Sequence, residues 1–480
     1  MTAGILIYVP ERILCLYIIC DQMEELMTNI WAKTALTHQG WLSDILVTID
    51  DDGRISALKP DCPPSGYQVG ILLPAPVNAH SHAFQRAMAG LTERRGPHGH
   101  DSFWTWRDLM FRFLDQLTPD HVEAIAAFVQ LEMLEAGYAS VAEFHYLHHA
   151  PGGEVYACLA EMSSRIVEAA ALSGIGLTLL PVFYRYGGCD QRPLGEGQIR
   201  FGNDPGRFAD LFEGAGEALA ALPGDARIGL ALHSLRAVAP DDIAPIAALL
   251  EAGPIHMHLA EQQAEVDEVQ AAWGQRPVAW LLDHLPVDQR WCLIHCTQME
   301  PLETIGLAKT GAIAGLCPIT ESNLGDGIFD GVRWLDAGGR LAVGSDSNIR
   351  IALSEELRTL DYSQRLRDGS RAALAVSERS TGRRLFEAIN QGGAMAAGRD
   401  CGRIEEGALA DLMALDGEAI DLSGRHGDTL LDSYVFAGDD RMVTDVWSAG
   451  RHQVRAGLHV ARDVIVNRYR AVMSELRDAL

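Results

Sequence analysis

The sequence has few cysteines and little positive charge, and both shortages exclude classes of protein. Its nine cysteines form no CxxC pair and follow no regular spacing. A disulfide framework is therefore not expected, whereas a reducing compartment such as the cytoplasm is. Only 39 basic side chains stand against 65 acidic ones, which gives a formal net charge of −26. Because this field repels phosphate backbones and anionic surfaces, neither nucleic acid nor a membrane is expected as a partner.

Long hydrophobic runs are missing as well. The longest unbroken apolar run of the opening segment, Ile13 to Cys20, is far shorter than the roughly 20 residues that span a bilayer. Charged residues and a proline interrupt this segment, and no basic region precedes it, which is unlike a signal peptide. Met27 begins MTNIWAKTALTHQGW, which reads as a natural start. Residues 1–26 are therefore expected to be an unstructured N-terminal extension.

The two ends of the chain share a pattern of short strands and turns. WLSDILVTIDDDGRISAL reads as a hairpin that turns at Asp52 and Gly53. In the tail, GALADLMALD, SYVFAGDD and VTDVWSAGRHQVRAG read as further short strands, and RDVIVNRYRAVMSELRDAL reads as a closing helix. We predict a small β-sandwich domain built from residues 27–73 and 401–480, with the closing helix as its last element.

Between these ends, strand-like apolar runs alternate with helical stretches. The runs cover residues 71–79, 139–145, 175–183, 228–232, 254–257, 291–294, 311–317 and 340–344. This alternation predicts an α/β fold, a (β/α)8 TIM-type barrel with insertions over residues 74–400. A doubly wound sheet is the structural alternative, but it would concentrate polar residues at one switch point. Nearly every run here ends in a polar residue, which favours the barrel, whose active sites lie at the carboxyl ends of all strands.

Two histidines, His80 and His82, follow the first run. Side chains two apart on a strand point to the same side, so these imidazoles converge. His258 follows the fifth run and Asp346 follows the eighth. Neutral imidazoles and one carboxylate can hold a catalytic zinc ion while a coordination position stays open for water. We predict one divalent metal per chain, with Zn²⁺ as the expected ion, bound by His80, His82, His258 and Asp346.

Further polar residues at the strand ends suit proton transfer. PIHMHLAE offers both His256 and His258, and His258 is favoured because Glu261 follows it by three positions. Glu261 is predicted to carry protons between the attacking water and the leaving nitrogen. His295, at the end of the sixth run, can polarise the electrophile or orient the attacking oxygen. Asp346 can also accept a hydrogen bond from that oxygen, so the predicted catalytic residues are Glu261, His295 and Asp346.

This arrangement of polar residues resembles the amidohydrolase superfamily. The shared features are HxH on the first strand, histidines on the fifth and sixth strands, and an aspartate on the eighth. The fourth run, in LALHSLRAV, offers His233 where binuclear members carry a carboxylated lysine that bridges two metals. The resemblance therefore implies the mononuclear, deaminase-like branch, and it also implies a flanking β-sandwich formed by both chain ends.

Longer stretches are similar to the formimidoylglutamate deiminase family. They are NAHSHAFQRAMAGLTE, SFWTWRDLMFRF, EFHYLHH, LHSLRAV and PITESNLGDGIF. The resemblance implies hydrolysis of N-formimino-L-glutamate to N-formyl-L-glutamate and ammonia in histidine degradation. It also implies substrate binding by Gln85, Arg107, Tyr146, His233 and Arg236. The chemistry agrees, because a dicarboxylate in an acidic protein needs local guanidinium partners.

Two alternatives remain open. A deaminase of an aminated purine or a related amidine would use the same metal and proton-transfer groups, although a neutral heterocycle would prefer apolar and amide contacts where the two arginines stand. A non-catalytic metal-binding barrel is the other class, and the presence of both Glu261 and His295 argues against it.

Other polar residues near the strand ends are given no chemical role. Glu321 and Asn323 are expected only to shape the seventh loop, and His148 and His149 are expected to be loop residues near the mouth of the barrel. The expected partners are a small dicarboxylate substrate and a second copy of the chain in a homodimer.

Overall fold

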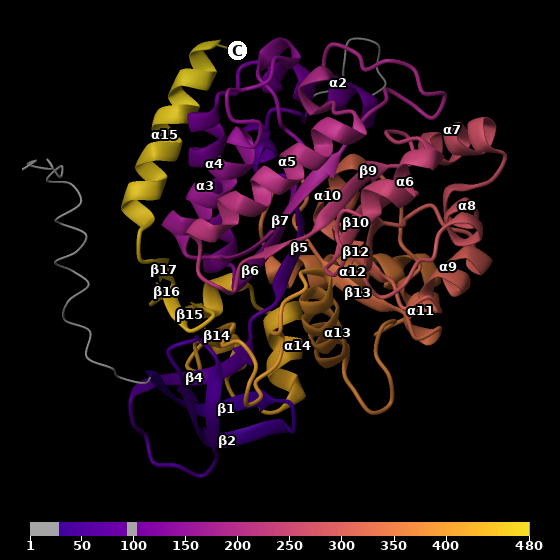
Figure 1. Cartoon of the computed structure of the whole chain (residues 1–480). Helices are drawn as coiled ribbons and strands as arrows, with labels where there is room; N and C mark the ends of the chain where they lie inside the picture. The colour runs from indigo at the N-terminus through magenta and orange to yellow at the C-terminus, as the bar shows by residue number, and fades with distance from the viewer. Residues whose placement is uncertain (1–27, 94–102, 480) are drawn as a thin grey trace, which may run out of the picture.

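The middle of the chain forms a closed parallel barrel, and both ends meet in a second sheet (Figure 1). The computed structural model describes residues 28–93 and 103–479. In barrel order the strands are β5 (Val77–Ser81), β6 (Ser140–His145), β7 (Gly176–Phe183), β9 (Leu230–Ser234), β10 (Ile255–Leu259), β11 (Trp291–His295), β12 (Ile313–Leu316) and β13 (Arg340–Val343). The short β8 (Arg227–Ile228) pairs with β7 beside this path. The predicted (β/α)8 barrel is thus confirmed.

The barrel closes where its first strand meets the segment that follows its last. The backbone N–H of Asp346 donates to His80 O, and that of His82 donates to Asp346 O, both at 2.9 Å. A Cβ added to Gly344 would lie 2.5 Å from His80 N, so only glycine allows this approach. Closure therefore places Asp346 beside both histidines of the first strand.

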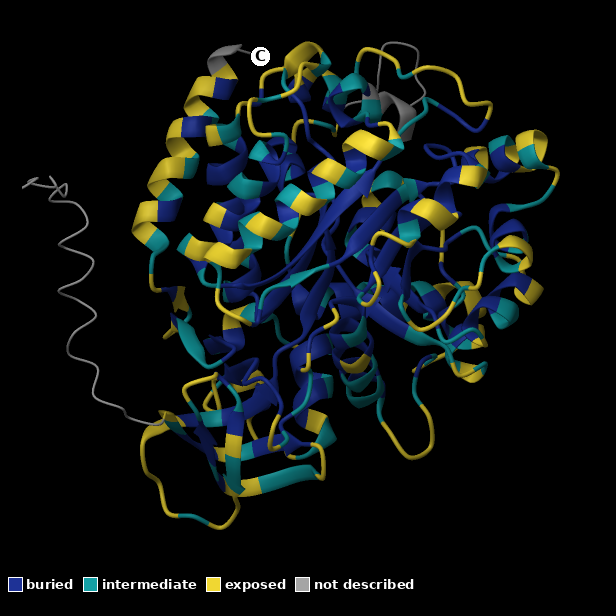
Figure 2. Cartoon of the chain, in the orientation of Figure 1, coloured by how far each residue is buried: buried dark blue, intermediate teal, exposed yellow. Residues whose placement is uncertain are grey.

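Helices surround the barrel and cover the outer face of its strands, while the inward-facing side chains of the strands fill the interior. Every residue of β6, β7, β10 and β11 is buried, which explains why these strands read as continuous apolar runs. Figure 2 shows the barrel strands buried and the exposed residues on the outer faces of the helices. The helices are α2 (Phe103–Leu114), α3 (Pro119–Glu135), α4 (Glu161–Ser173), α5 (Pro205–Ala218), α6 (Pro240–Ala247), α7 (Gln263–Trp273), α8 (Pro277–His284), α9 (Pro301–Ala308), α10 (Pro318–Leu324), α11 (Gly331–Asp336), α12 (Leu353–Asp368) and α13 (Thr381–Ala396).

The second sheet combines strands from both ends of the chain, as predicted. Its order is β17 (Leu458–His459), β16 (Arg451–Arg455), β15 (Val443–Ser448), β14 (Leu412–Leu415), β4 (Tyr67–Pro74), β1 (Thr28–Thr37), β2 (Gly40–Ile49) and β3 (Ile55–Lys59). The junction is the antiparallel pair of β4 and β14, and the predicted hairpin is formed by β2 and β3. The domain boundaries drawn from the sequence stay predictions.

A buried ion-pair cluster ties this sheet to the barrel. Arg399, which is fully buried, lies 3.1 Å from a carboxylate oxygen of both Asp225 and Asp411. Arg451 of β16 reaches Asp225 as well, at 2.8 Å. Burial alone would raise the pKa of Asp225, but the two guanidinium groups hold it below its usual value. The charges are thus compensated within the cluster.

Two predictions about individual elements were inaccurate. The first run, 71–79, is not one strand, because β4 ends at Pro74 and β5 begins at Val77 with Pro76 between them. SYVFAGDD was wrongly read as a strand. Its first four residues end the helix α14 (Asp428–Phe436), whose buried Leu430, Leu431, Tyr434 and Val435 have helical spacing.

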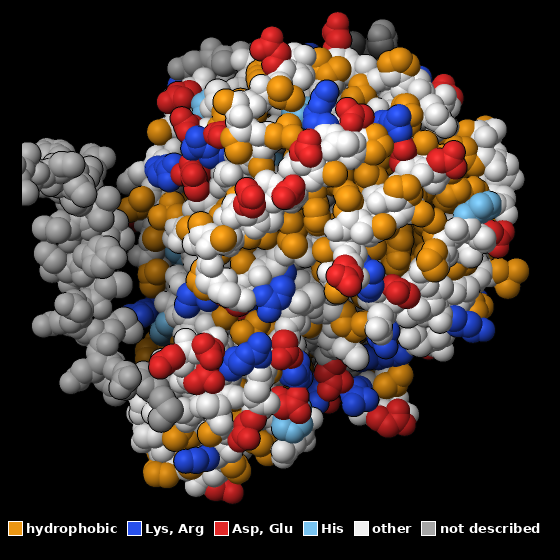
Figure 3. Space-filling view, viewed as in Figure 1, with side chains coloured by type: hydrophobic (Ala, Val, Ile, Leu, Met, Phe, Trp, Pro, Cys, Tyr) orange, Lys and Arg blue, Asp and Glu red, His pale blue; other side chains and the backbone are white. Residues whose placement is uncertain are grey.

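The chain ends in α15 (Arg462–Ala479), which confirms the predicted closing helix. It packs along α3, where the rings of Tyr469 and Phe128 stack with centroids 4.0 Å apart (Figure 1). The expected extension, residues 1–26, lies outside the described residues. Among the helices of the described part, none is long and apolar enough to cross a membrane. On the face viewed in Figure 3, acidic and basic side chains are interspersed, so the net negative charge is not gathered there into one patch.

Candidate active site

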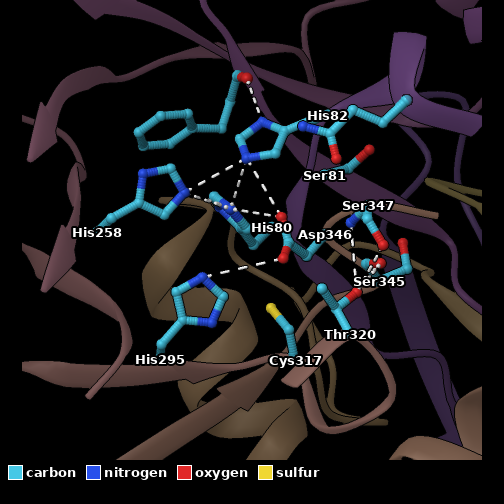
Figure 4. A network of polar contacts seen from close by, with 12 residues as sticks. His80, Ser81, His82, His258, His295, Cys317, Thr320, Ser345, Asp346 and Ser347 are labelled. Carbon is cyan, nitrogen blue, oxygen red and sulfur yellow. Dashed lines mark hydrogen bonds and ion pairs between the residues drawn. The ribbon is translucent and has the colours of Figure 1, made fainter. Parts of the chain in front are cut away.

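The four predicted metal ligands converge at the carboxyl end of the barrel (Figure 4). The Nε2 atoms of His80, His82 and His258 lie 3.1 to 3.3 Å from one another. Asp346 Oδ1 lies 3.4 Å from His80 Nε2 and 3.2 Å from His82 Nε2. Tetrahedral zinc bonds of about 2.0 to 2.1 Å place neighbouring ligand atoms about 3.3 to 3.4 Å apart. The side chains are therefore spaced to hold such an ion.

The tautomers of two imidazoles support the same conclusion. His82 Nδ1 lies 2.9 Å from Phe144 O, and His258 Nδ1 lies 3.0 Å from His233 O. A carbonyl oxygen only accepts, so each Nδ1 carries the hydrogen and each neutral ring turns a lone pair on Nε2 toward the other. Lone pairs that face one another at 3.3 Å need a cation between them, and second-shell carbonyls of this kind are typical of metal-bound histidine.

The protonation of the cluster also suits a metal. Burial, together with the charge of His82, lowers the pKa of His80 to about 3, and burial lowers the pKa of His82 and His258 as well. These rings are therefore neutral near pH 7, which is the form that binds metal. Burial would raise the pKa of Asp346, but the hydrogen bond from His80 and the neighbouring imidazoles hold it well below its usual range.

Backbone strain concentrates at the same strand ends. His295 and Asp346 have φ angles of +71° and +46°, in the left-handed region that side chains other than glycine seldom adopt. Asn348 stabilises the second of these turns. Its Nδ2 donates to Asp346 O at 3.1 Å, His82 O at 3.2 Å and Ser81 Oγ at 3.2 Å. One buried amide thus links the two segments that supply the aspartate and the HxH pair.

Glu261 and His295 lie beside the ligand cluster and close to each other. Glu261 Oε1 is 3.7 Å from His295 Nε2, and Oε2 is 3.9 Å from the Arg236 guanidinium. Burial raises the pKa of Glu261 to about 7, although His295 and Arg236 oppose this shift. A carboxyl group with a pKa near 7 can both accept and release protons at neutral pH.

Glu321 has a closer relation to the site than the sequence indicated. Its Oε1 lies 3.3 Å from His295 Nδ1 and also accepts the backbone N–H of Cys317 at 2.8 Å. Burial alone would lower the pKa of His295, but the carboxylates of Glu261, Glu321 and Asp346 raise it well above its usual value. The expectation that Glu321 only shapes a loop was therefore wrong. Asn323 donates from Nδ2 to exposed Glu93 at 3.0 Å.

The five predicted substrate-binding residues line a single cavity above the cluster. Gln85, on the 3-10 helix η1 (Ala83–Met88), donates from Nε2 to the Tyr146 hydroxyl at 2.8 Å. Arg107, on α2, lies over the ring of Phe111, 5.4 Å from its centroid. His233 and Arg236 come from the end of β9 and the loop that follows it. The same cavity is bordered by Glu261, His295 and Asp346.

The histidines that were given no metal role lie away from the cluster. His256 points to the opposite side of β10, where its Nε2 lies 2.7 Å from Ala396 O at the end of α13. His148 and His149 are buried rather than exposed, and their Nε2 atoms face the backbone oxygens of Val182 and Gly202 at 2.9 and 3.0 Å. Each of the three is held by a backbone carbonyl, which gives it a structural role.

The cavity is also lined by residues that the sequence did not point to, and among them are two interacting polar pairs. Tyr184 and Gln198 are paired by a hydrogen bond of 2.7 Å, and Arg192 pairs with Glu268 at 3.1 Å. Tyr184 lies at the end of a strand, but no sequence pattern links it to Gln198. The other three are Gln198 and Arg192, in the loop after β7, and Glu268 on α7. At these positions the spacing of residues in the sequence does not indicate where a side chain points.

Comparison with known proteins shows which family this chain is similar to. The sequence matches the model of the amidohydrolase family over residues 71–452, and that of the formimidoylglutamate deiminase HutF N-terminal domain over residues 27–67. It is 46% identical over 459 residues to the formimidoylglutamate deiminase of Pseudomonas aeruginosa, which covers 94% of this chain and 100% of that protein. A 5-methylthioadenosine/S-adenosylhomocysteine deaminase of Natronomonas pharaonis is 28% identical over 77% of this chain and 78% of its own length.

Solved structures are similar over nearly the whole chain. The crystal structure of an amidohydrolase from Brucella melitensis has a TM-score of 0.89 at 46% identity, and the match covers 93% of this chain and 99% of that one. Atrazine chlorohydrolase from Arthrobacter aurescens, solved in complex with zinc, has a TM-score of 0.78 at 22% identity, with 93% and 99% covered. At that identity the second similarity shows the fold alone.

Proposed function

We propose, from the premise that this chain belongs to the amidohydrolase family and within it to the formimidoylglutamate deiminases, that it hydrolyses N-formimino-L-glutamate to N-formyl-L-glutamate and ammonia in histidine degradation. The observation that carries the proposal is the set of groups that line one cavity. Three guanidinium groups, a carboxyl group with a pKa near 7 and three of the four proposed metal ligands, His82, His258 and Asp346, border it.

The metal is divalent, and we propose that it is zinc, held by His80, His82, His258 and Asp346. The facing lone pairs and the spacing of 3.1 to 3.4 Å support this set. When bound, such an ion supplies Lewis-acid activation of water. His295 offers its Nε2 at 3.9 Å from Asp346 Oδ2 and is assigned to hydrogen bonding rather than to metal binding.

Glu261 is assigned to proton transfer. In the reaction, the water oxygen bonds to the formimino carbon, the bond to the terminal nitrogen breaks, and both water hydrogens end on that nitrogen, which leaves as ammonia. Glu261 takes each proton from the oxygen and gives it to the nitrogen. His295, held by Glu321 on one side, donates from the other side to the oxygen as charge develops there, and Asp346 accepts a hydrogen bond from the attacking water.

Arg107, His233 and Arg236 are assigned to the substrate carboxylates, and Gln85 with Tyr146 to the formimino group. Planar guanidinium groups bind carboxylates through two parallel hydrogen bonds, which fixes orientation as well as affinity. The Tyr146 ring lies 4.8 Å from that of His82, so the pair of Gln85 and Tyr146 stands next to the ligand cluster. This arrangement presents the formimino carbon to Glu261.

A deaminase of an aminated purine is the second candidate, because it would use the same metal and proton-transfer residues. Arg107 and Arg236 in the cavity argue against it, since a neutral heterocycle would prefer apolar and amide contacts where these guanidinium groups stand. A non-catalytic metal-binding barrel would have no use for a buried carboxyl group with a pKa near 7.

The test is ammonia release from a panel of N-formimino-glutamate, N-formimino-aspartate and aminopurines. We expect turnover of formimino amino acids that stops when a chelator removes the metal and returns when Zn²⁺ is added. Faster release from an aminopurine would overturn the substrate assignment. No release from any compound by fully metal-loaded protein would support the non-catalytic alternative.

A further inference from the structure

Tyr184 occupies a defined place in the cavity although no role has been assigned to it above. It follows β7, is 6% exposed, and lines the cavity together with Arg107 and Arg236. Its ring packs on His233 with centroids 4.5 Å apart, and His233 in turn packs on His258 at 5.0 Å. Tyr184 therefore lies one ring farther from the metal ligands than His233 does.

The hydrogen bonds of Tyr184 leave its hydroxyl hydrogen available. Gly195 N–H donates to Gln198 Oε1 at 3.0 Å, which fixes the amide so that Nε2 faces Tyr184. This Nε2 donates to the Tyr184 oxygen at 2.7 Å, so the phenol oxygen acts as an acceptor there. Within residues 28–93 and 103–479 the hydroxyl has no other hydrogen-bond contact, and its hydrogen remains for an acceptor in the cavity.

The surroundings of this hydroxyl select an anion. Burial raises the pKa of Tyr184, although Arg236 and Arg107 lower it, so the phenol keeps its hydrogen at neutral pH. Those two arginines make the region around it positive. A neutral O–H donor beside guanidinium groups matches a carboxylate, which offers several acceptor sites.

We propose that Tyr184, oriented by Gln198, binds the distal carboxylate of the substrate and thereby selects a dicarboxylate. This inference rests on the proposed function. The formimino group must lie at Glu261 and the ligand cluster, which Gln85 and Tyr146 adjoin. The carboxylate at the far end of the side chain then points away from the cluster, toward the Tyr184 hydroxyl.

The experiment compares Tyr184→Phe with the parent on two substrates, N-formimino-L-glutamate and N-formimino-L-norvaline. The second has the same chain length but ends in a methyl group. We expect kcat/KM for the glutamate derivative to fall about 10- to 100-fold, mainly through KM, because a hydrogen bond to a charged group is lost. For the norvaline derivative, kcat/KM should change less than about twofold. Tyr186→Phe, a control on the same segment whose ring lies under Arg185, should leave both unchanged.

Two further measurements keep the assignment falsifiable. Inhibition by glutarate should weaken in Tyr184→Phe while inhibition by butyrate stays the same. Gln198→Met, which leaves the ring intact, should raise KM for the glutamate derivative in the same direction. Equal losses on both substrates, or no loss on either, would overturn the role of Tyr184 while leaving the proposed function intact. If the parent itself releases no ammonia from N-formimino-L-glutamate, the proposed function fails first and this inference with it.

Discussion

Replacing Glu261 with Gln separates proton transfer from metal binding. The substitution keeps the size of the side chain but removes its ability to carry a proton. Glu261 is 5% exposed, its oxygens lie 3.7 Å from His295 and 3.9 Å from Arg236, and it is not one of the proposed ligands His80, His82, His258 and Asp346. We therefore expect metal content to remain at one ion per chain.

The size of the effect follows from this geometry. Loss of a positioned acid or base slows turnover by about 10²- to 10⁴-fold, which corresponds to about 2.7 to 5.4 kcal/mol of activation free energy. KM should stay the same or fall, because Arg236 loses the carboxylate at 3.9 Å that competes with the substrate for its charge. The loss should therefore appear in kcat, as expected for an interaction that matters only in the transition state.

The assay pairs ammonia release with elemental analysis of the same protein sample. Glu251→Gln, an exposed position outside the cavity, is the matched control and should behave like the parent. Near-parent kcat in Glu261→Gln with full metal content would refute the reasoning and assign proton transfer to another group. A loss of metal in parallel with activity would show that Glu261 acts through the ion instead.

Three more predictions test the ligands, the substrate contacts and the fold. His258→Ala should lose the tightly held metal, whereas His256→Ala, two positions away, should keep it and lose about 1 to 3 kcal/mol of stability, measured by elemental analysis and denaturant titration. Replacement of either Arg107 or Arg236 by Lys should lower kcat/KM in steady-state assays by a factor that corresponds to about 1.5 to 3 kcal/mol of transition-state stabilisation. The reason is that lysine lacks the planar guanidinium group and its two parallel hydrogen bonds. Arg399→Met should destabilise the protein by about 3 to 5 kcal/mol near pH 7, since buried Asp411 loses its guanidinium partner and Asp225 keeps only Arg451, and calorimetry should find a lower Tm. Asp225, whose pKa is lowered in the folded state partly by Arg399, stabilises the protein above its unfolded pKa near 4, so this part of the deficit should shrink as the pH falls below about 4.

The convergence of the four proposed ligand side chains was predictable because strand ends constrain direction. A side chain at the carboxyl end of a parallel strand has few places to point, and HxH on β5 puts both rings on one side. The choice of His258 over His256 also follows from strand alternation once the barrel is assumed, because one of the two must face outward. The alternation of residues in the sequence and the alternation of side chains along a strand therefore select the same inward-facing histidine.

Residues in loops were harder to predict. Glu321 meets His295 only because α10 begins directly after β12, and Tyr184 meets Gln198 only through the course of the loop after β7. Neither contact leaves a periodic signal in the sequence. The misread segment SYVFAGDD shows a related limit, since four residues from the end of a helix also fit a short strand.

The backbone contacts that pair the strands and close the barrel also position the side chains of the site. The carbonyls that orient His82 and His258 belong to Phe144 on β6 and His233 on β9, so each ligand is aligned by the strand next to it. Asp346 is placed by hydrogen bonds that complete the barrel. A shift of one residue in any of these pairings would turn the donor groups away and point the side chains outward. The geometry of the proposed ligands is thus set by strand register, whereas the proposed substrate contacts on loops can vary without disturbing it, which is the division expected of a barrel that supports many reactions.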